Sequence, residues 1–139
     1  MKRRLGVLVL CGLVSLLVLG CTGLSQEVKK EGVSFVVTTP VVELGKETKV
    51  VMYGTGFAPK QEIMLMFVDN IGVPSVIMVE SLKPVPVPNK EGAWATVWSC
   101  APYLQSIPKG TVMINVTDKD YRTLASAPVV FMAPEAKKK

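Results

Sequence analysis

Few side chains in this sequence combine the type and the spacing that catalysis needs. The chain contains no histidine, which removes the commonest general base, the Ser-His-Asp arrangement and most zinc sites. Asp118 and Asp120 form the closest pair of carboxylates. Two carboxylates can act as acid and base when they flank a substrate, but a pair two residues apart in a predicted turn is poorly placed to do so. We therefore predict no catalytic residue and no enzymatic activity.

The same two aspartates could contribute to a calcium site, because loops between strands can gather oxygen ligands. Asp69 and Asn70 could add oxygens at the end of a predicted strand. A complete calcium site needs about six to eight oxygens, which is more than these residues supply. Formation of turns, in which Asp and Asn side chains bond to nearby backbone groups, is the better interpretation. We predict no metal site.

Met64 and Met66 lie two residues apart in a strand-like segment, and therefore on one face of it. Thioether clusters bind Cu(I), often beside histidine, so these two residues leave open a carrier of a metal or small ligand. Because histidine is absent and the methionines lie in apolar runs, filling of the hydrophobic core is the stronger interpretation. We predict no cofactor.

The cysteines lie in three different settings. Residues 2–4 are basic and residues 5–20 are uncharged and apolar, which is the order of a secretory signal peptide. Cys11 lies inside this leader and Cys21 directly follows it. Cys100 ends a strand-like run, where we expect a small buried side chain that packs as an apolar residue.

Val18-Leu19-Gly20-Cys21 resembles the lipobox of bacterial lipoproteins, in which an apolar residue, one or two small residues and Gly or Ala precede a cysteine. The resemblance implies that the Cys21 thiol carries a diacylglycerol, that a lipoprotein signal peptidase cuts after Gly20, and that Cys21 becomes the acylated first residue. Two acyl chains hold a protein stably, since each buried methylene contributes about 0.8 kcal/mol. The alternative is an uncleaved signal anchor. With Cys11 removed and Cys21 acylated, Cys100 has no partner for an internal disulfide.

Removal of the leader changes the charge of the protein. The 16 basic residues fall to 13 because residues 2–4 are lost, while the 11 acidic residues stay, so the net charge falls from +5 to +2. Lys137, Lys138 and Lys139 supply +3 by themselves. The predicted folded part is thus nearly neutral, which argues against a nucleic-acid-binding surface. The terminal lysines could touch anionic lipid, although a solvated tail is the stronger interpretation.

The composition predicts a division of the chain into four parts. These are a signal peptide over residues 1–20, a lipidated cysteine and flexible tether over 21–32, a β-rich domain over 33–133, and a basic tail over 134–139. No segment of the domain has a helical apolar period, whereas short alternating runs separated by turn residues recur. Trp94 and Trp98 share one face of such a run and are expected to be heavy core residues. The expected strands are 33–39 continued by 41–44, 47–53, 62–69, 73–82, 93–100, 111–117 and 122–133.

About seven strands in roughly 100 residues predict a two-sheet β-sandwich. The proline-rich segment 83–88 is expected to cross from one sheet to the other, because prolines cannot donate ladder hydrogen bonds. Five motifs resemble those of bacterial immunoglobulin-like and IPT/TIG-type domains, and the resemblance covers residues 33–133. They are Gly54-Thr55-Gly56-Phe57-Ala58-Pro59, Glu62-Ile63-Met64-Leu65, Glu91-Gly92-Ala93-Trp94, Ile107-Pro108-Lys109-Gly110-Thr111-Val112 and Ala125-Ser126-Ala127-Pro128-Val129.

The resemblance implies a binding, spacing or adhesive module that has no catalytic residue. Together with the lipobox, it predicts a lipoprotein anchored to the bilayer on the extracytoplasmic side of a cell membrane. Its expected partner is another protein or polymer of the cell envelope, and not a nucleic acid. Two alternatives stay open at this point: a metal or small-ligand carrier that uses Met64 and Met66 or the aspartate loops, and an accessory subunit of a surface enzyme or transporter.

Overall fold

The computed structural model describes residues 32–134. The predicted signal peptide, Cys21, nearly all of the tether and the terminal lysines lie outside these residues. Within residues 32–134 there is no helix that is long and apolar enough to cross a membrane.

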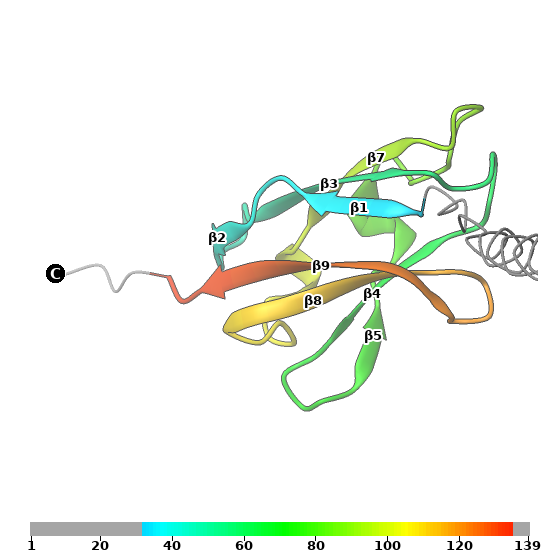
Figure 1. Cartoon of the computed structure of the whole chain (residues 1–139). Helices are drawn as coiled ribbons and strands as arrows, with labels where there is room; N and C mark the ends of the chain where they lie inside the picture. Colours follow the sequence, from blue (N-terminus) through cyan, green and yellow to red (C-terminus); the bar gives the residue numbers. More distant parts are fainter. Residues whose placement is uncertain (1–31, 135–139) are drawn as a thin grey trace, which may run out of the picture. The chain divides into compact units, whose positions relative to one another are not determined.

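The described chain forms two packed β-sheets (Figure 1). All neighbours in the first sheet are antiparallel, in the order β1-β3-β7-β6. Its strands are β1 (Ser34–Val37), β3 (Lys49–Thr55), β7 (Trp94–Ser99) and β6 (Leu82–Lys83).

The second sheet has five strands in the order β2-β9-β8-β4-β5, of which only β2 and β9 run parallel. They are β2 (Val41–Glu43), β9 (Thr123–Met132), β8 (Gly110–Thr117), β4 (Met64–Val68) and β5 (Pro74–Val76). Two short 3-10 helices, η2 (Val79–Ser81) and η3 (Ala101–Tyr103), lie in the connections.

This strand order is that of an immunoglobulin-like sandwich, as the sequence predicted. The sheet β1-β3-β7-β6 corresponds to strands A, B, E and D, and β9-β8-β4 corresponds to G, F and C. β2 and β5 are short additions at the two edges of the second sheet, so the described residues contain nine strands in place of about seven. The chain leaves β1 for β2 at Pro40, which has no N–H to offer either sheet.

Alternation of apolar and polar residues builds the core between the sheets. Trp94 and Trp98 both point inward from β7, which confirms the prediction for this strand. Trp98 is fully buried, and its ring lies 5.5 Å from that of Phe67, 5.7 Å from Tyr103 and 6.1 Å from Phe131. These aromatic contacts tie both sheets and η3 into one core, because the four residues come from β7, β4, η3 and β9.

The proline-rich segment does not cross between the sheets, so that prediction was wrong. Lys83 is already paired with Val97 of β7 in the first sheet, and the prolines return the chain to β7 of the same sheet. The crossing takes place in residues 77–81, because the side chains of Ile77 and Leu82 are both buried in the core on either side of η2. The expected strand 73–82 is therefore divided, and only residues 74–76 pair in the second sheet.

The described chain enters and leaves the sandwich at opposite ends (Figure 1). β1 begins beside the end of β3, where Ser34 pairs with Thr55, and β9 ends beside the start of β8, where Phe131 pairs with Gly110. We call these the N-terminal end and the C-terminal end of the sandwich. The N-terminal end carries the connections 56–63, 84–93 and 118–122, and the C-terminal end carries 44–48, 69–73 and 100–109.

Candidate functional site

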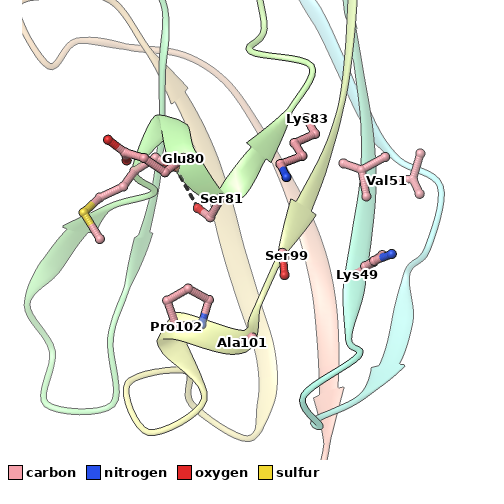
Figure 2. Close-up of a pocket in the computed structure, with 10 residues that line it drawn as sticks. Lys49, Val51, Glu80, Ser81, Lys83, Ser99, Ala101 and Pro102 are labelled. Atoms are coloured by element: carbon pink, nitrogen blue, oxygen red, sulfur yellow. Dashed lines mark hydrogen bonds between the residues drawn. The ribbon is translucent and has the colours of Figure 1, made fainter.

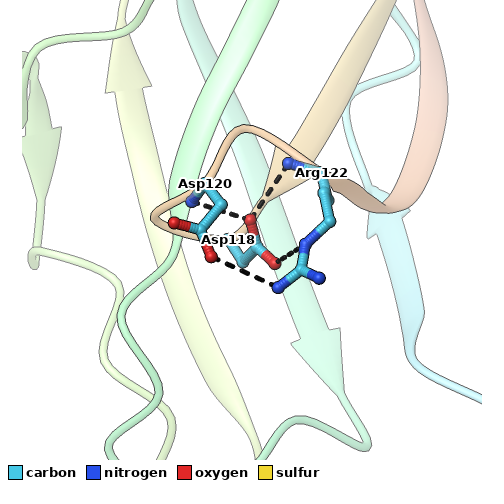
Figure 3. Close-up of polar contacts among 3 residues, drawn as sticks. All are labelled: Asp118, Asp120 and Arg122. Atoms are coloured by element: carbon cyan, nitrogen blue, oxygen red, sulfur yellow. Dashed lines mark hydrogen bonds and ion pairs between the residues drawn. The ribbon is translucent and has the colours of Figure 1, made fainter.

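The aspartates singled out in the sequence form a turn that is closed by an arginine (Figure 3). One oxygen of Asp118 accepts hydrogen bonds from the backbone N–H groups of Asp120 and Arg122, at 2.9 and 3.0 Å. Its other oxygen accepts from Nε of Arg122 at 2.9 Å. An oxygen of Asp120 lies 3.3 Å from Nη2 of Arg122. The Arg122 guanidinium thus takes the place beside the two carboxylates that a metal cation would need.

These hydrogen bonds also change the acidity of Asp118. The backbone N–H of Arg122, followed by that of Asp120 and by the guanidinium, favours the ionised form and holds the pKa of Asp118 below its usual 3.8. A carboxylate that stays charged and saturated with donors stabilises a turn and is not available as an acid or a base. The structure supports the interpretation of these residues as turn formers.

Asp69 and Asn70 lie at the other end of the five-stranded sheet from Asp118. Met64 pairs with Thr117 at the start of β4, so Asp69, after the end of β4, is about 17 Å along the strand from the Asp118 turn. One oxygen of Asp69 accepts hydrogen bonds from the N–H groups of Ile71 and Val73 at 3.0 and 2.8 Å. The two loops cannot share one calcium ion. No three carboxylate or thiol side chains come together as metal ligands anywhere in the described part of the chain.

Met64 and Met66 do not lie in the core, in contrast to the sequence-based interpretation. They are half-buried on the outward face of β4, opposite Thr117 and Asn115 of β8. The methionine that does lie in the core is Met52, which is fully buried on β3. β4 carries apolar residues on both faces, with Leu65 and Phe67 inward and Met64 and Met66 outward, so alternation alone did not distinguish its inward face.

Cys100 is fully buried, as the sequence predicted. Desolvation by the surrounding core raises the pKa of its thiol to about 12. The thiolate is the reactive form of cysteine, so Cys100 is inert at neutral pH.

A groove lies on the outward face of the four-stranded sheet (Figure 2). This groove has a volume of about 730 Å³. Val51 of β3 and Val97 of β7 are direct cross-strand neighbours and form its floor. The two 3-10 helices η2 and η3 form its walls. The complete lining is Lys49, Val51, Met78, Glu80, Ser81, Lys83, Val97, Ser99, Ala101 and Pro102.

Local hydrogen bonds fix the walls of the groove. The Ser81 hydroxyl donates to the carbonyl of Met78 at 2.7 Å and closes η2. The N–H of Met78 in turn donates to the Tyr103 hydroxyl at 2.7 Å. Because Tyr103 belongs to η3 and packs against Trp98, both walls are attached to the core, and the hollow is a fixed feature of the fold.

Lysines flank the apolar floor on two sides. Lys83 pairs with Val97 on β6, and Lys49 pairs with Ser99 on β3, so their Cα atoms lie about 12 Å apart, from usual strand spacing and rise. Neither ammonium group has an ion-pair partner among residues 32–134. The Lys83 side chain reaches toward the space between Ser81 and Ser99, whereas the carboxylate of Glu80 points the other way (Figure 2). The groove thus offers apolar contact and positive charge.

The sequence did not predict this groove. It is assembled from β3, η2, β6, β7 and η3, whose proximity depends on the complete fold. One signal was present in the sequence: Val51 and Val97 are apolar residues at positions that alternate with core residues, and so face outward.

No protein-family model matches the chain, and no curated protein sequence matches it significantly.

Proposed function

We propose that the protein is a lipid-anchored, non-catalytic binding module of the bacterial cell envelope. Acyl chains on Cys21 hold it to the extracytoplasmic face of a cell membrane, and the sandwich binds an acidic envelope protein or polymer in the groove. The observation that carries the proposal is the groove itself, which combines an apolar floor with two lysines that have no acidic partner within residues 32–134.

The position of the groove supports this function. Its floor and lysines lie near the start of β3 and the end of β7, which is the half of the sandwich toward its C-terminal end. The tether joins the domain at Gly32, at the N-terminal end. An anchored molecule therefore presents the groove on the half that is farther from its attachment point, where a partner can reach it.

The chemistry of the groove supports binding over catalysis. Its titratable side chains are Lys49, Lys83 and Glu80, and the carboxylate of Glu80 is directed away from the lysines (Figure 2). A general acid and base must both reach the reacting atoms. Two cations over an apolar floor instead attract and hold a ligand that carries negative charge and apolar groups.

Photo-crosslinking in intact cells tests the binding site. A photoreactive residue at Val97, in the groove, should capture an acidic partner, whereas the same residue at Val36, on the same sheet face but outside the groove, should not. Reversal of charge in Lys49→Glu/Lys83→Glu should reduce capture at least about tenfold, which corresponds to ~1.4 kcal/mol. Lys60→Glu/Lys90→Glu, which reverses two exposed lysines outside the groove, is the matched control. If Val97 and Val36 capture equal amounts of partner, or if the charge reversal does not reduce capture, the groove is not the binding site.

Mass spectrometry tests the anchor separately. The mature chain should begin at Cys21 and carry acyl chains, and a Cys21→Ser variant should keep its leader and gain no lipid. A wild-type product that retains Met1, or one whose Cys21 is unmodified, contradicts the anchor without affecting the test of the groove.

A further inference from the structure

The outward face of the five-stranded sheet is almost free of charge. The register places fifteen side chains on it, of which only Glu43, at the corner formed by β2, is charged. The opposite face of the sandwich carries Lys49 and Lys83 on a smaller sheet. The outward residues are Val41, Glu43, Ser126, Pro128, Val130, Met132, Thr111, Met113, Asn115, Thr117, Met64, Met66, Val68, Pro74 and Val76.

Large apolar side chains on this face are open to water. Val68 is 44% exposed, Val76 39%, Met113 45% and Met132 49%. Single exposed apolar residues are ordinary, but a contiguous apolar patch of this kind marks a contact surface. The outward face of an antiparallel sheet normally carries polar residues. Here β8 follows that pattern at Thr111, Asn115 and Thr117, whereas β4, β5 and the end of β9 carry apolar residues instead.

The face carries both a hollow and a projecting side chain. A hollow of about 370 Å³ lies over Met66, Val68 and Pro74. Tyr121 stands at its rim with 63% of its surface exposed. The backbone of Tyr121 has a φ of +62°, which is uncommon for a residue with a side chain, and the Asp118 turn holds it there through a hydrogen bond from its N–H to the carbonyl of Asp118. One uncharged face thus carries both a projecting aromatic ring and a hollow.

A polar pair lies near the middle of the face. The Ser126 hydroxyl donates to Oδ1 of Asn115 at 2.6 Å. The amide nitrogen of Asn115 donates to no other residue of the described chain. Its two N–H groups therefore remain as hydrogen-bond donors in an otherwise apolar centre.

We infer that this face binds the same face of a second copy of the protein, so that two sandwiches pack sheet against sheet. A two-fold axis brings largely uncharged surface against largely uncharged surface, with Glu43 at a corner of the face, and it makes every contact twice. It also lets the Tyr121 ring of each copy approach the hollow of the other and gives each Asn115 amide a polar group to donate to. Apart from Glu43 at the corner, a charged partner finds no complementary charge on this face.

The size of the face sets the strength of the contact. Five strands about 4.8 Å apart and about six residues long on average cover roughly 24 by 20 Å, which is less than the ~800 Å² per partner of a standard complex. The pair is therefore weak in dilute solution and forms where copies are concentrated. Attachment to a membrane, which rests on the proposed function, supplies such a concentration.

Cross-linking of single cysteines in membranes of expressing cells tests the inference with the full-length protein. Met66→Cys and Met113→Cys, treated with a short bismaleimide, should each give a product of twice the monomer mass. Val36→Cys, on the other sheet and similarly exposed at 51%, is the control for random collision. The unmodified protein gives the background from its own cysteines. Tryptophan fluorescence verifies that each variant is folded.

A second substitution makes the test specific for the face. Met113→Lys in the Met66→Cys protein should reduce the dimer product at least about tenfold, because a charge is then buried against its own symmetry mate, and Val36→Lys in the same background should leave it unchanged. Equal products from Val36→Cys and Met113→Cys, a product with another protein, or no product from either face cysteine would each overturn the inference.

Discussion

At the scale of single residues, Trp98 contributes most to the core. Its ring is fully buried and contacts three other aromatic rings from β4, η3 and β9. Trp98→Ala should lower the free energy of unfolding by about 3 to 5 kcal/mol, since the cavity adds to the lost burial. Denaturant unfolding followed by circular dichroism measures the change.

Trp98→Phe is the matched control for that substitution. It keeps an aromatic ring and removes an indole N–H that is buried without a hydrogen-bond partner, so it should cost clearly less than Trp98→Ala. Equal costs for the two variants would mean that the ring contacts do not stabilise the fold.

Asp118 gives the turn between β8 and β9 a dependence on pH. Because its pKa is lowered in the folded state, its stabilising effect is complete above the usual value of 3.8 and is lost as the pH falls through the lower native pKa. Asp118→Asn should therefore unfold at lower denaturant concentration than wild type near pH 7, and the difference should shrink at about pH 2.

Asp120→Asn is the control, because Asp120 makes only the longer ion pair with Arg122, at 3.3 Å. Its effect at neutral pH should be smaller than that of Asp118→Asn. A difference between wild type and Asp118→Asn that is the same at both pH values would show that the charge of Asp118 is not involved.

At the scale of elements, one glycine determines how two loops pack at the N-terminal end. Gly92 has a φ of +76°, and a Cβ placed there would clash with the carbonyl oxygen of Phe57. The N–H of Phe57 also donates to the carbonyl of Gly92 at 3.1 Å. Gly92→Ala should thus destabilise the protein by more than the ~1 kcal/mol that positive φ alone costs.

Gly72→Ala separates the cost of a positive φ from the cost of the contact with Phe57. Gly72 has a similar φ of +82°, but a Cβ there meets nothing within 4 Å. Its substitution should cost only about 1 kcal/mol. Thermal unfolding of both variants gives the comparison, and equal losses would mean that the loop contact at Phe57 adds nothing.

Local alternation in the sequence is sufficient to predict most elements. Inward and outward residues of β3, β7 and β8 follow it directly, because each pairs on both sides and buries one face. The crossing at residues 77–81 could not be predicted this way. Ile77 and Leu82 both look like parts of one strand, and only the positions of the two sheets make the chain turn between them.

At the scale of the whole molecule, sites made of one segment were predictable and sites made of several were not. The Asp118 turn lies within five residues, so its hydrogen-bonding role follows from residue types alone. The groove requires β3, β6 and β7 to lie in register, and the uncharged face requires the order of five strands. Met64 is a further example. Both faces of its strand are apolar, so the sequence alone did not tell whether Met64 points into the core or away from it.

The entry and exit of the chain at opposite ends affects how the molecule responds to a pull. β2 and β9 run parallel, and the hydrogen bonds from Val130 to Pro40 and from Leu44 to Met132 join them at 2.8 and 2.9 Å. A load applied between Gly32 and Pro134 acts along these strands and across their hydrogen bonds. The hydrogen bonds are then loaded in shear and must break together, not one after another. A molecule that is attached at one end and pulled at the other therefore resists mechanical unfolding.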